Sequence, residues 1–217
     1  MEPTTVHVVR HGQVYNPDGI LYGRQPGFGL SDLGREMAER VADYFADVPL
    51  AHLRTSPLQR AQETMAPIAA KHPELDLTVD PRVIEAANAF EGARFGSDNK
   101  ILFRPSSWWH FRNPLRPSWG EPYPEIAERM LAAIVDAAAS VPQGGQALIV
   151  SHQLPIWIAR LAAEKRSFVH DPRRRETHLA SVTGFRLIGD QIIGVEYHQP
   201  AGDLAPVTSA KKFRVGT

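Results

Sequence analysis

The chain has 217 residues, 43% of them hydrophobic, which is enough to bury one substantial core and predicts a single domain over residues 1–217. Basic and acidic residues balance at 24 each, so no overall field favours nucleic acid or an acidic membrane surface, and any anion site must be local. The absence of cysteine excludes disulfides, thiolate nucleophiles and thiolate metal sites.

The chain begins with one strand pattern and one helix pattern. Val6–Val9 is a short β-branched run that predicts a buried strand ending at the loop Arg10-His11-Gly12. Ser31 is the expected N-cap of a helix that ends before Pro49. The apolar stripe of this helix recurs at four-residue spacing in Leu33, Met37, Val41 and Phe45.

A second strand and a second helix follow directly. Ala51–Thr55 predicts a weaker strand, after which Ser56 offers a capping hydroxyl and Pro57 suits the first helical position. The buried face of this helix is marked by Leu58, Ala61, Met65 and Ile68. This arrangement places Arg60 in the first turn of the helix.

The second half of the chain repeats the alternation. Tyr123–Val141 predicts a helix, and Ala147–Val150 predicts a buried strand. The apolar stripe of the helix consists of Ile126, Met130, Ile134 and Ala138. Val182–Leu187 and Ile192–Tyr197 predict two last strands, joined at Gly189-Asp190 and added antiparallel near a sheet edge. Strands that alternate with helices in this way predict an α/β fold with a mostly parallel sheet.

Two of the predicted strands end beside a histidine. Ligands of an open parallel sheet bind beyond the carboxyl ends of its strands, so we expect His11 and His152 to face one site. Arg10 puts a permanent cation beside His11, and Gly12 lets a ligand approach the backbone closely. Arg60 adds a guanidinium where the free amides of a helix start also favour an anion. Two arginines that can clamp equatorial oxygens predict a phosphoryl-binding site.

Three motifs occur in the order and spacing of a known family. They are Arg10-His11-Gly12, the segment Ser56–Thr64 and the pair Ser151-His152. Each motif alone has an ordinary structural explanation, but together they resemble the phosphoglycerate mutase-like branch of the histidine phosphatase superfamily. The resemblance covers residues 5 to about 92 and 146–198. It implies a three-layer sandwich with a mostly parallel central sheet flanked by helices.

The resemblance also implies roles for the residues that match. His11 attacks phosphorus, while Arg10, Arg60 and His152 hold the phosphoryl group. His7 lies four residues before His11, but on a strand the two side chains do not converge, and no carboxylate–histidine pattern resembles a metal site. We therefore expect catalysis without a metal ion or another cofactor.

A carboxylic acid must protonate the leaving oxygen in a reaction of this kind. In the family this acid comes shortly before a Trp/Phe-Glu-Gly element, and Glu85, which precedes Phe90-Glu91-Gly92, fits that position. Glu91 and Asp80 lie close in sequence and remain alternatives for the acid.

The loops around the predicted site depart from the family pattern. Gln13–Asn16 is one residue shorter than the family sequence, although Asn16 remains a candidate phosphate ligand. Gly23 and Arg24 stand where the family loop runs beneath the substrate, so both are candidate substrate-binding residues. Arg24 either recognises a second anionic group or is a surface arginine. The run Arg173–Arg175 is more typical of a solvated loop than of a polyanion site.

Residues 88–122 form an unusual segment. They are rich in aromatic, arginine, proline and serine residues, show no steady period, and are too many for an ordinary connection. We expect an insertion or cover that overhangs the site, with most of its aromatic residues anchored on the core. Basic residues such as Arg104 and Arg112 are expected to help select the leaving group.

The sequence therefore predicts a phosphohydrolase that removes phosphate from a small phosphomonoester through a phosphohistidine intermediate. One alternative is a phosphoglycerate mutase-type isomerase, which must protect phosphohistidine from water. The shortened loop after Gly12 argues mildly against this alternative. The other is a non-catalytic phospholigand-binding protein, against which the complete set of candidate catalytic residues argues.

The same reasoning sets the expected partners and location. The expected partner is a small phosphorylated metabolite, with neither nucleic acid nor a membrane, and a homodimer is left open. The N-terminus lacks the basic and apolar regions of a secretory signal, and no apolar run approaches a membrane span. We therefore expect a cytoplasmic protein.

Overall fold

The computed structural model describes residues 2–93 and 120–204, in which strands and helices alternate along the chain. The strands are β1 (Thr4–Arg10), β2 (Leu50–Thr55), β3 (Leu77–Val79), β4 (Gln146–Ser151), β5 (Val182–Ile188) and β6 (Gln191–His198). The α-helices of the described residues are α1 (Asp32–Phe45), α2 (Gln59–Lys71), α4 (Tyr123–Ala139) and α5 (Gln153–Ala163). Every strand and helix predicted from the sequence is therefore present, whereas β3 and α5 are additional.

The strands form one sheet in the order β3-β2-β4-β1-β5-β6. The first four strands of this order run parallel, and β5 and β6 continue the sheet antiparallel, as predicted. In the β1–β4 pair Arg10 lies opposite Ser151. The next residue of each strand, His11 and His152, therefore leaves the sheet at the same carboxyl edge.

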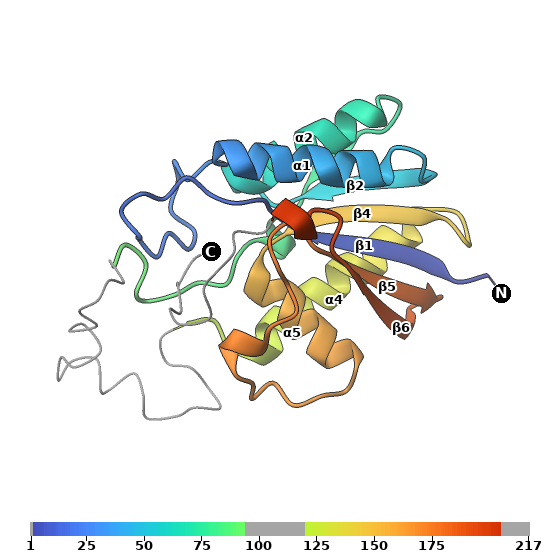
Figure 1. Ribbon diagram of the computed structural model, residues 1–217. Coiled ribbons are helices and arrows are strands. Elements are labelled where there is room, and N and C mark those ends of the chain that lie inside the picture. Colours follow the sequence, from blue (N-terminus) through green and yellow to red (C-terminus); the bar gives the residue numbers. More distant parts are fainter. Residues whose placement is uncertain (1, 94–119, 205–217) are drawn as a thin grey trace.

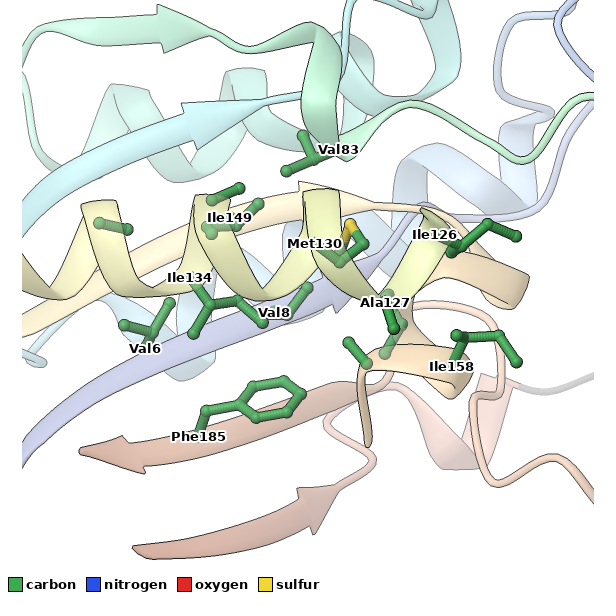
Figure 2. Packing of buried hydrophobic residues seen from close by; sticks show 14 of the residues in the cluster. Val6, Val8, Val83, Ile126, Ala127, Met130, Ile134, Ile149, Ile158 and Phe185 are labelled. Carbon is green, nitrogen blue, oxygen red and sulfur yellow. The ribbon is translucent and has the colours of Figure 1, made fainter. Parts of the chain in front are cut away.

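Helices cover both faces of the sheet, which confirms the expected α/β fold. In Figure 1, α1 and α2 lie on one face, and α4 and α5 lie on the other. Side chains of β1 alternate between the two layers, because Val6 and Val8 join the core under α4 and α5 whereas Val9 joins the core under α1 and α2. Figure 2 shows Ile134 of α4 packed close to Val6 and Val8.

The two additional elements lack the pattern that would predict them. All three residues of β3 are exposed at the sheet edge, so no alternation of buried and exposed positions marks this strand. The helix α5 begins directly after His152 and contains Pro155 in its first turn. Proline is tolerated there because the first backbone N–H groups of a helix have no intrahelical acceptor.

The predicted helix starts have different outcomes. Ser31 is the N-cap of α1, and its hydroxyl accepts a hydrogen bond of 3.0 Å from the Gly34 amide. The prediction that Ser56 caps α2 is wrong, because this helix has Leu58 as its N-cap and begins at Gln59. The Ser56 hydroxyl instead lies 2.7 Å from His152 Nε2. It therefore contacts a side chain at the carboxyl edge of the sheet.

Parts of the expected organisation stay predictions. Residues 94–119, which include Arg104 and Arg112, and residues 205–217 lie outside the described part of the chain, and so does most of the expected cover at 88–122. The single domain over residues 1–217 is likewise an expectation that the fold leaves untested. Among the helices of the described residues, none is both long and apolar enough to cross a membrane.

The contact between α1 and the loop after β1 generates the first testable prediction. A Cβ atom built at Gly34 would overlap the Gln13 carbonyl oxygen, although alanine is normally better than glycine in a helix by about 1 kcal/mol. We expect Gly34→Ala to lower the free energy of unfolding by about 1–3 kcal/mol, because the loop must move to admit the methyl group. Urea denaturation of the two proteins measures this difference.

Gly194→Ala is the matched control, because a Cβ atom there meets no heavy atom within 4 Å. The control should unfold at the same or a higher urea concentration than the wild type. A Gly34→Ala protein as stable as the Gly194→Ala protein would show that the loop after His11 adapts freely to α1.

Candidate active site

His11 lies at the carboxyl end of β1 with 1% of its surface exposed. Its backbone amide donates to the Ser151 carbonyl of β4, which fixes the point where the chain leaves the sheet. The ring Nδ1 lies 2.8 Å from the Gly12 carbonyl oxygen, and the ring Nε2 lies 3.2 Å from Arg60 Nε. Both nitrogens of the imidazole therefore have a defined neighbour.

These two neighbours determine the tautomer of His11. A carbonyl oxygen only accepts hydrogen bonds, so Nδ1 must carry the proton, and a guanidinium N–H only donates, so Nε2 must present its lone pair. A neutral imidazole whose Nε2 carries no proton keeps the lone pair with which it can attack an electrophile.

Arg60 occupies the first turn of α2, as predicted, and is 1% exposed. Its terminal Nη2 donates to the Gly23 carbonyl at 2.7 Å, and its guanidinium lies 4.6 Å from the centre of the Tyr22 ring. Gly23 has φ +43°, and a side chain there would overlap the Glu91 carboxylate. Glycine at this position therefore lets the loop bring its carbonyl up to Arg60.

Thr64 connects the loop after β1 to α2. Its hydroxyl accepts a hydrogen bond from the Gly12 amide at 3.1 Å and donates to the Arg60 carbonyl at 2.7 Å. The backbone that follows His11 is thereby tied to the helical turn that carries Arg60.

Arg10 is the second buried guanidinium at this edge. Its Nη1 donates to the Thr177 carbonyl at 2.8 Å, and only 4% of the residue is exposed. Its buried Nε has no hydrogen-bond partner among the described residues. Since a buried donor without an acceptor costs about 1–3 kcal/mol, Arg10 retains capacity for an anionic ligand.

His152 lies beside His11, with 5.1 Å between the ring centres. The Ser56 hydroxyl accepts from the Leu58 amide at 3.3 Å and can donate its own proton to His152 Nε2 at 2.7 Å. In that arrangement Nδ1 of His152 carries the ring proton, and this buried nitrogen has no partner within the described part of the chain. His152 can thus supply a further N–H donor beside the His11 ring.

Both imidazoles are held in the neutral form. Burial lowers the pKa of His11 well below its usual value, and the charges of Arg60 and Arg10 lower it further. The pKa of His152 is likewise well below its usual value, first through burial and then through the charge of Arg60. Removal from water and neighbouring positive charge disfavour the same state, the imidazolium.

Glu85 follows the short 3-10 turn at Pro81–Val83 and is partly buried. Burial raises the pKa of Glu85, and the charges of Arg60, Arg10 and Arg175 oppose that rise without cancelling it. Its Oε1 accepts a hydrogen bond of 2.9 Å from the Ala86 amide. The carboxyl group therefore stays protonated to a higher pH than a solvent-exposed glutamate, as a proton donor requires.

The backbone around Glu85 is held by an ion-pair network. Arg24 Nε donates to the Glu85 carbonyl at 2.7 Å, and Arg24 Nη2 pairs with Glu121 at 2.9 Å. Arg129 donates hydrogen bonds from two nitrogens to the same Glu121 carboxylate, and it donates to the Ile84 carbonyl at 2.9 Å. This network fixes the Glu85 backbone in place, and neither Glu121 nor Arg129 is marked by any sequence motif.

The alternative acids differ from Glu85 in their surroundings. Asp80 pairs with Arg54 at 2.9 Å and with Arg82, and although burial raises the pKa of Asp80, the Arg82 hydrogen bonds outweigh burial and lower it. Asp80 is therefore poorly suited to donate a proton. Glu91 lies within electrostatic range of Arg60 and accepts a hydrogen bond from the Asn88 amide, and it remains an alternative.

The loop residues predicted to bind substrate differ in how close they lie to the candidate site. Gly23 contacts Arg60 directly, whereas the Asn16 amide closes its own loop by bonding the Ile20 backbone at 2.8 and 3.0 Å. The Arg24 side chain is engaged by Glu121 and by backbone, which favours a positioning role over recognition of a second anion. The substrate-binding roles of these residues stay predictions.

No group of three or more His, Asp or Glu side chains that could hold a metal ion occurs within residues 2–93 and 120–204. The expectation of catalysis without a metal ion rests on the arginines of the site and stays a prediction. Arg10 and Arg60 place two positive charges that act on His11.

Comparison with known proteins identifies the family. The sequence pattern of the histidine phosphatase superfamily (branch 1) matches residues 6–199. The chain therefore belongs to that superfamily. The protein Rv0525 of Mycobacterium tuberculosis, described as uncharacterized, is 53% identical over 200 residues, which cover 92% of this chain and 98% of that protein.

Solved structures of similar fold carry different names. YhfR of Bacillus stearothermophilus has a TM-score of 0.73 and 26% identity, covering 87% of this chain and 94% of its own. A mycobacterial glucosyl-3-phosphoglycerate phosphatase, Rv2419c, complexed with VO3 has a TM-score of 0.70, 22% identity and coverage of 89% and 96%. A phosphoglycerate mutase of Bacillus anthracis has a TM-score of 0.66, 21% identity and coverage of 91% and 93%. The last two show a shared fold, which both named activities use.

The buried neutral imidazoles generate a prediction about stability and pH. The unfolded chain takes up a proton at His152 below a pH of about 6.5, whereas the folded protein does so only at much lower pH. Each such histidine makes the free energy of unfolding fall by about 1.4 kcal/mol per pH unit as the pH drops below that value. We expect His152→Gln to reduce the slope between pH 6 and pH 5 by up to this amount, as measured by urea denaturation.

Denaturation at pH 8 provides the baseline, because imidazoles are neutral there in both states and the difference reports only the cost of the substitution. Parallel stability curves for wild type and His152→Gln from pH 8 to pH 5 would contradict a neutral, buried His152.

Proposed function

We propose that the protein is a phosphohydrolase that removes phosphate from a small phosphomonoester through a phosphohistidine intermediate. One observation carries the proposal. The buried Nε2 lone pair of His11 faces Arg60 Nε at 3.2 Å, and at the same sheet edge the buried Arg10 Nε and His152 Nδ1 lack a protein acceptor among the described residues. Buried cationic and neutral donors around a nucleophile match the oxygens of a phosphoryl group.

In the first step, His11 Nε2 attacks phosphorus in line with the bond to the leaving oxygen. The P–N bond forms while the P–O bond breaks, and Glu85 transfers its proton to the leaving oxygen. Arg10, Arg60 and His152 stabilise charge on the three equatorial oxygens. Because Nδ1 of His11 donates to Gly12, the ring proton remains on that nitrogen, and the Nε2 lone pair bonds phosphorus once the Arg60 Nε–H has turned from it to a phosphoryl oxygen.

In the second step, water attacks the phosphohistidine. The Glu85 carboxylate formed in the first step accepts a proton from the water, the new P–O bond forms, and the P–N bond breaks. Phosphate leaves, and both His11 and Glu85 return to their starting forms. The acid and base roles thus alternate on one carboxyl group.

The arginines supply the positive charge that a divalent cation supplies in many phosphoryl-transfer enzymes. A metal-independent reaction is therefore part of the proposal, as are a small phosphorylated metabolite as the partner and a cytoplasmic location. The isomerase alternative differs in one respect, because a hydroxyl of the substrate, and not water, accepts the phosphoryl group. Separate detection of free phosphate and of isomeric products distinguishes the two.

The nucleophile generates a direct prediction. We expect His11→Ala to abolish turnover of phosphomonoesters, because Nε2 of His11 is the atom that bonds phosphorus in this mechanism. Rapid-quench samples of the wild type with 32P-labelled substrate should contain an acid-labile protein phosphate, and those of His11→Ala should not. His198→Ala, at the exposed end of β6, is the matched control and should retain both signals.

The same experiment tests metal independence. Wild-type protein treated exhaustively with EDTA should form as much phosphohistidine as untreated protein, since the charge comes from Arg10 and Arg60. Activity in His11→Ala with no trapped phosphohistidine in the wild type would refute the proposed route. Loss in EDTA that a divalent ion restores would refute its metal independence alone.

The proposed acid generates a prediction about leaving groups and pH. Glu85→Gln keeps an acceptor for the Ala86 amide but has no proton to give. We expect kcat/KM for an alkyl phosphate to fall about 10²- to 10⁴-fold. For p-nitrophenyl phosphate kcat/KM should fall much less, because its leaving group needs little protonation. Wild-type activity on the alkyl phosphate should fall as the pH rises through the raised pKa of Glu85, and the variant should lack this alkaline decline.

Glu91→Gln is the matched control, because Glu91 is the remaining alternative acid near Arg60. If Glu91→Gln shows the leaving-group dependence and Glu85→Gln does not, the acid is Glu91 and the two-step scheme keeps its other residues.

A further inference from the structure

The run of three arginines before β5 does not behave as one group. Arg173 pairs with Asp171 at 3.0 Å with 74% of its side chain exposed, and Arg174 is also exposed. Both belong to the 3-10 turn Pro172–Arg174, which Asp171 caps. Arg175 follows that turn with extended backbone and is partly buried. The expectation of a solvated run is confirmed for the first two arginines and is wrong for Arg175.

Arg175 lies on the side of the site that holds the proposed acid. Thr177, two residues after Arg175, accepts a hydrogen bond of 2.8 Å from Arg10, and the charge of Arg175 acts on the Glu85 carboxyl group and on Arg10. Arg175 is partly buried, and this burial lowers the pKa of its guanidinium, because removal from water disfavours the charged form. A third arginine therefore borders the site that contains Arg10 and Arg60.

A histidine holds the Arg175 side chain. Arg175 Nε donates to His170 Nε2 at 2.8 Å, and His170 Nδ1 donates to the Phe168 carbonyl at 2.7 Å. The His170 ring packs against Tyr123 and Trp157, with ring centres 5.9 and 5.8 Å away. An imidazole nitrogen that accepts from Nε orients the guanidinium without neutralising its charge. Within residues 2–93 and 120–204, Arg175 forms no ion pair with a carboxylate.

A bound phosphoryl group alone would not balance the positive charges of the three arginines at the site. In the proposed mechanism Arg10 and Arg60 match a phosphoryl dianion, and Glu85 is protonated when the substrate binds. The charge of Arg175 then remains in a partly desolvated position, which is unfavourable unless an anion is close. Because Glu85 protonates the leaving oxygen, an anion near Arg175 belongs to the leaving part of the substrate.

We propose that Arg175 is a specificity-determining residue that pairs with a second anionic group, a carboxylate or a phosphate, on the leaving part of the substrate. His170 is a positioning residue that aims the Arg175 guanidinium. This inference rests on the proposed function, because the leaving part is defined by the proposed acid. It assigns recognition of the second anion to Arg175 and leaves Arg24 in the network that holds Glu85.

The test compares probes that differ only in the second anion. The carboxylate pair is 3-phosphoglycerate and glycerol 3-phosphate, and the phosphate pair is propane-1,3-diol bisphosphate and its monophosphate. The preference is kcat/KM for the doubly anionic probe divided by that for its partner. We expect Arg175→Gln to lower the preference in at least one pair by about 10- to 100-fold, the usual effect of losing a charged hydrogen bond.

Arg174→Gln is the matched control, because it removes the same charge from an exposed neighbour, and it should leave both preferences at the wild-type value. His170→Gln should lower the same preference as Arg175→Gln by a smaller factor, mainly through KM. A loss in the carboxylate pair alone, or in the phosphate pair alone, identifies the anion. The proposal is overturned if Arg175→Gln leaves the preference unchanged in both pairs. An equal fall in kcat/KM for both members of a pair counts as an unchanged preference.

Two further measurements keep the result decisive. If Arg175→Gln does not fold, as judged by circular dichroism, Arg175→Lys replaces it and should lower the preference less, because an ammonium keeps the charge without the planar fork. Calorimetry measures the affinity of the four probes for the His11→Ala protein and for the His11→Ala/Arg175→Gln double variant, and this measurement does not depend on turnover. Absence of phosphohistidine in the wild type refutes the proposed function, whereas equal loss of affinity for both members of each pair, or no loss, refutes the role of Arg175.

Discussion

The contact between the Arg60 guanidinium and the His11 imidazole is the interaction on which the site depends. A guanidinium can only donate, so its approach to Nε2 at 3.2 Å is compatible only with an unprotonated nitrogen. The surrounding structure serves to bring this pair together. The edge of the sheet delivers His11, the first turn of α2 delivers Arg60, and the Gly23 carbonyl and Tyr22 ring hold the guanidinium on its other sides.

The sequence predicts those parts of the fold and site whose signals are local. The four-residue spacing of Met37, Val41 and Phe45 predicts α1, and these side chains are indeed fully buried. The strand ends at His11 and His152 predict a shared site because parallel strands end at one edge, and the register of β1 and β4 places them there. The α/β class follows from the alternation of the two periods along the chain.

Other features depend on contacts between distant segments and leave no local signal. Ser56 looks like a helix cap, yet its hydroxyl lies against His152, which is 96 residues away. From the sequence, Arg24 is either a ligand of a second anion or a surface arginine, whereas in the fold it bonds Glu121 and the backbone of Glu85. Arg175 is one of three identical neighbours in sequence, and only the turn before it and the His170 ring separate it from them.

The hydrogen bonds from Arg10 to Thr177 and from Arg60 to Gly23 have a consequence for ligand binding. An arginine side chain has about 2 kcal/mol of rotamer entropy, which a flexible surface arginine loses when it grips an anion. Here both side chains are already restricted by backbone carbonyls and by burial, so that loss occurs when the chain folds. An anion that binds in the proposed way would meet donors that need little further ordering, so less of its interaction energy would be offset by conformational entropy.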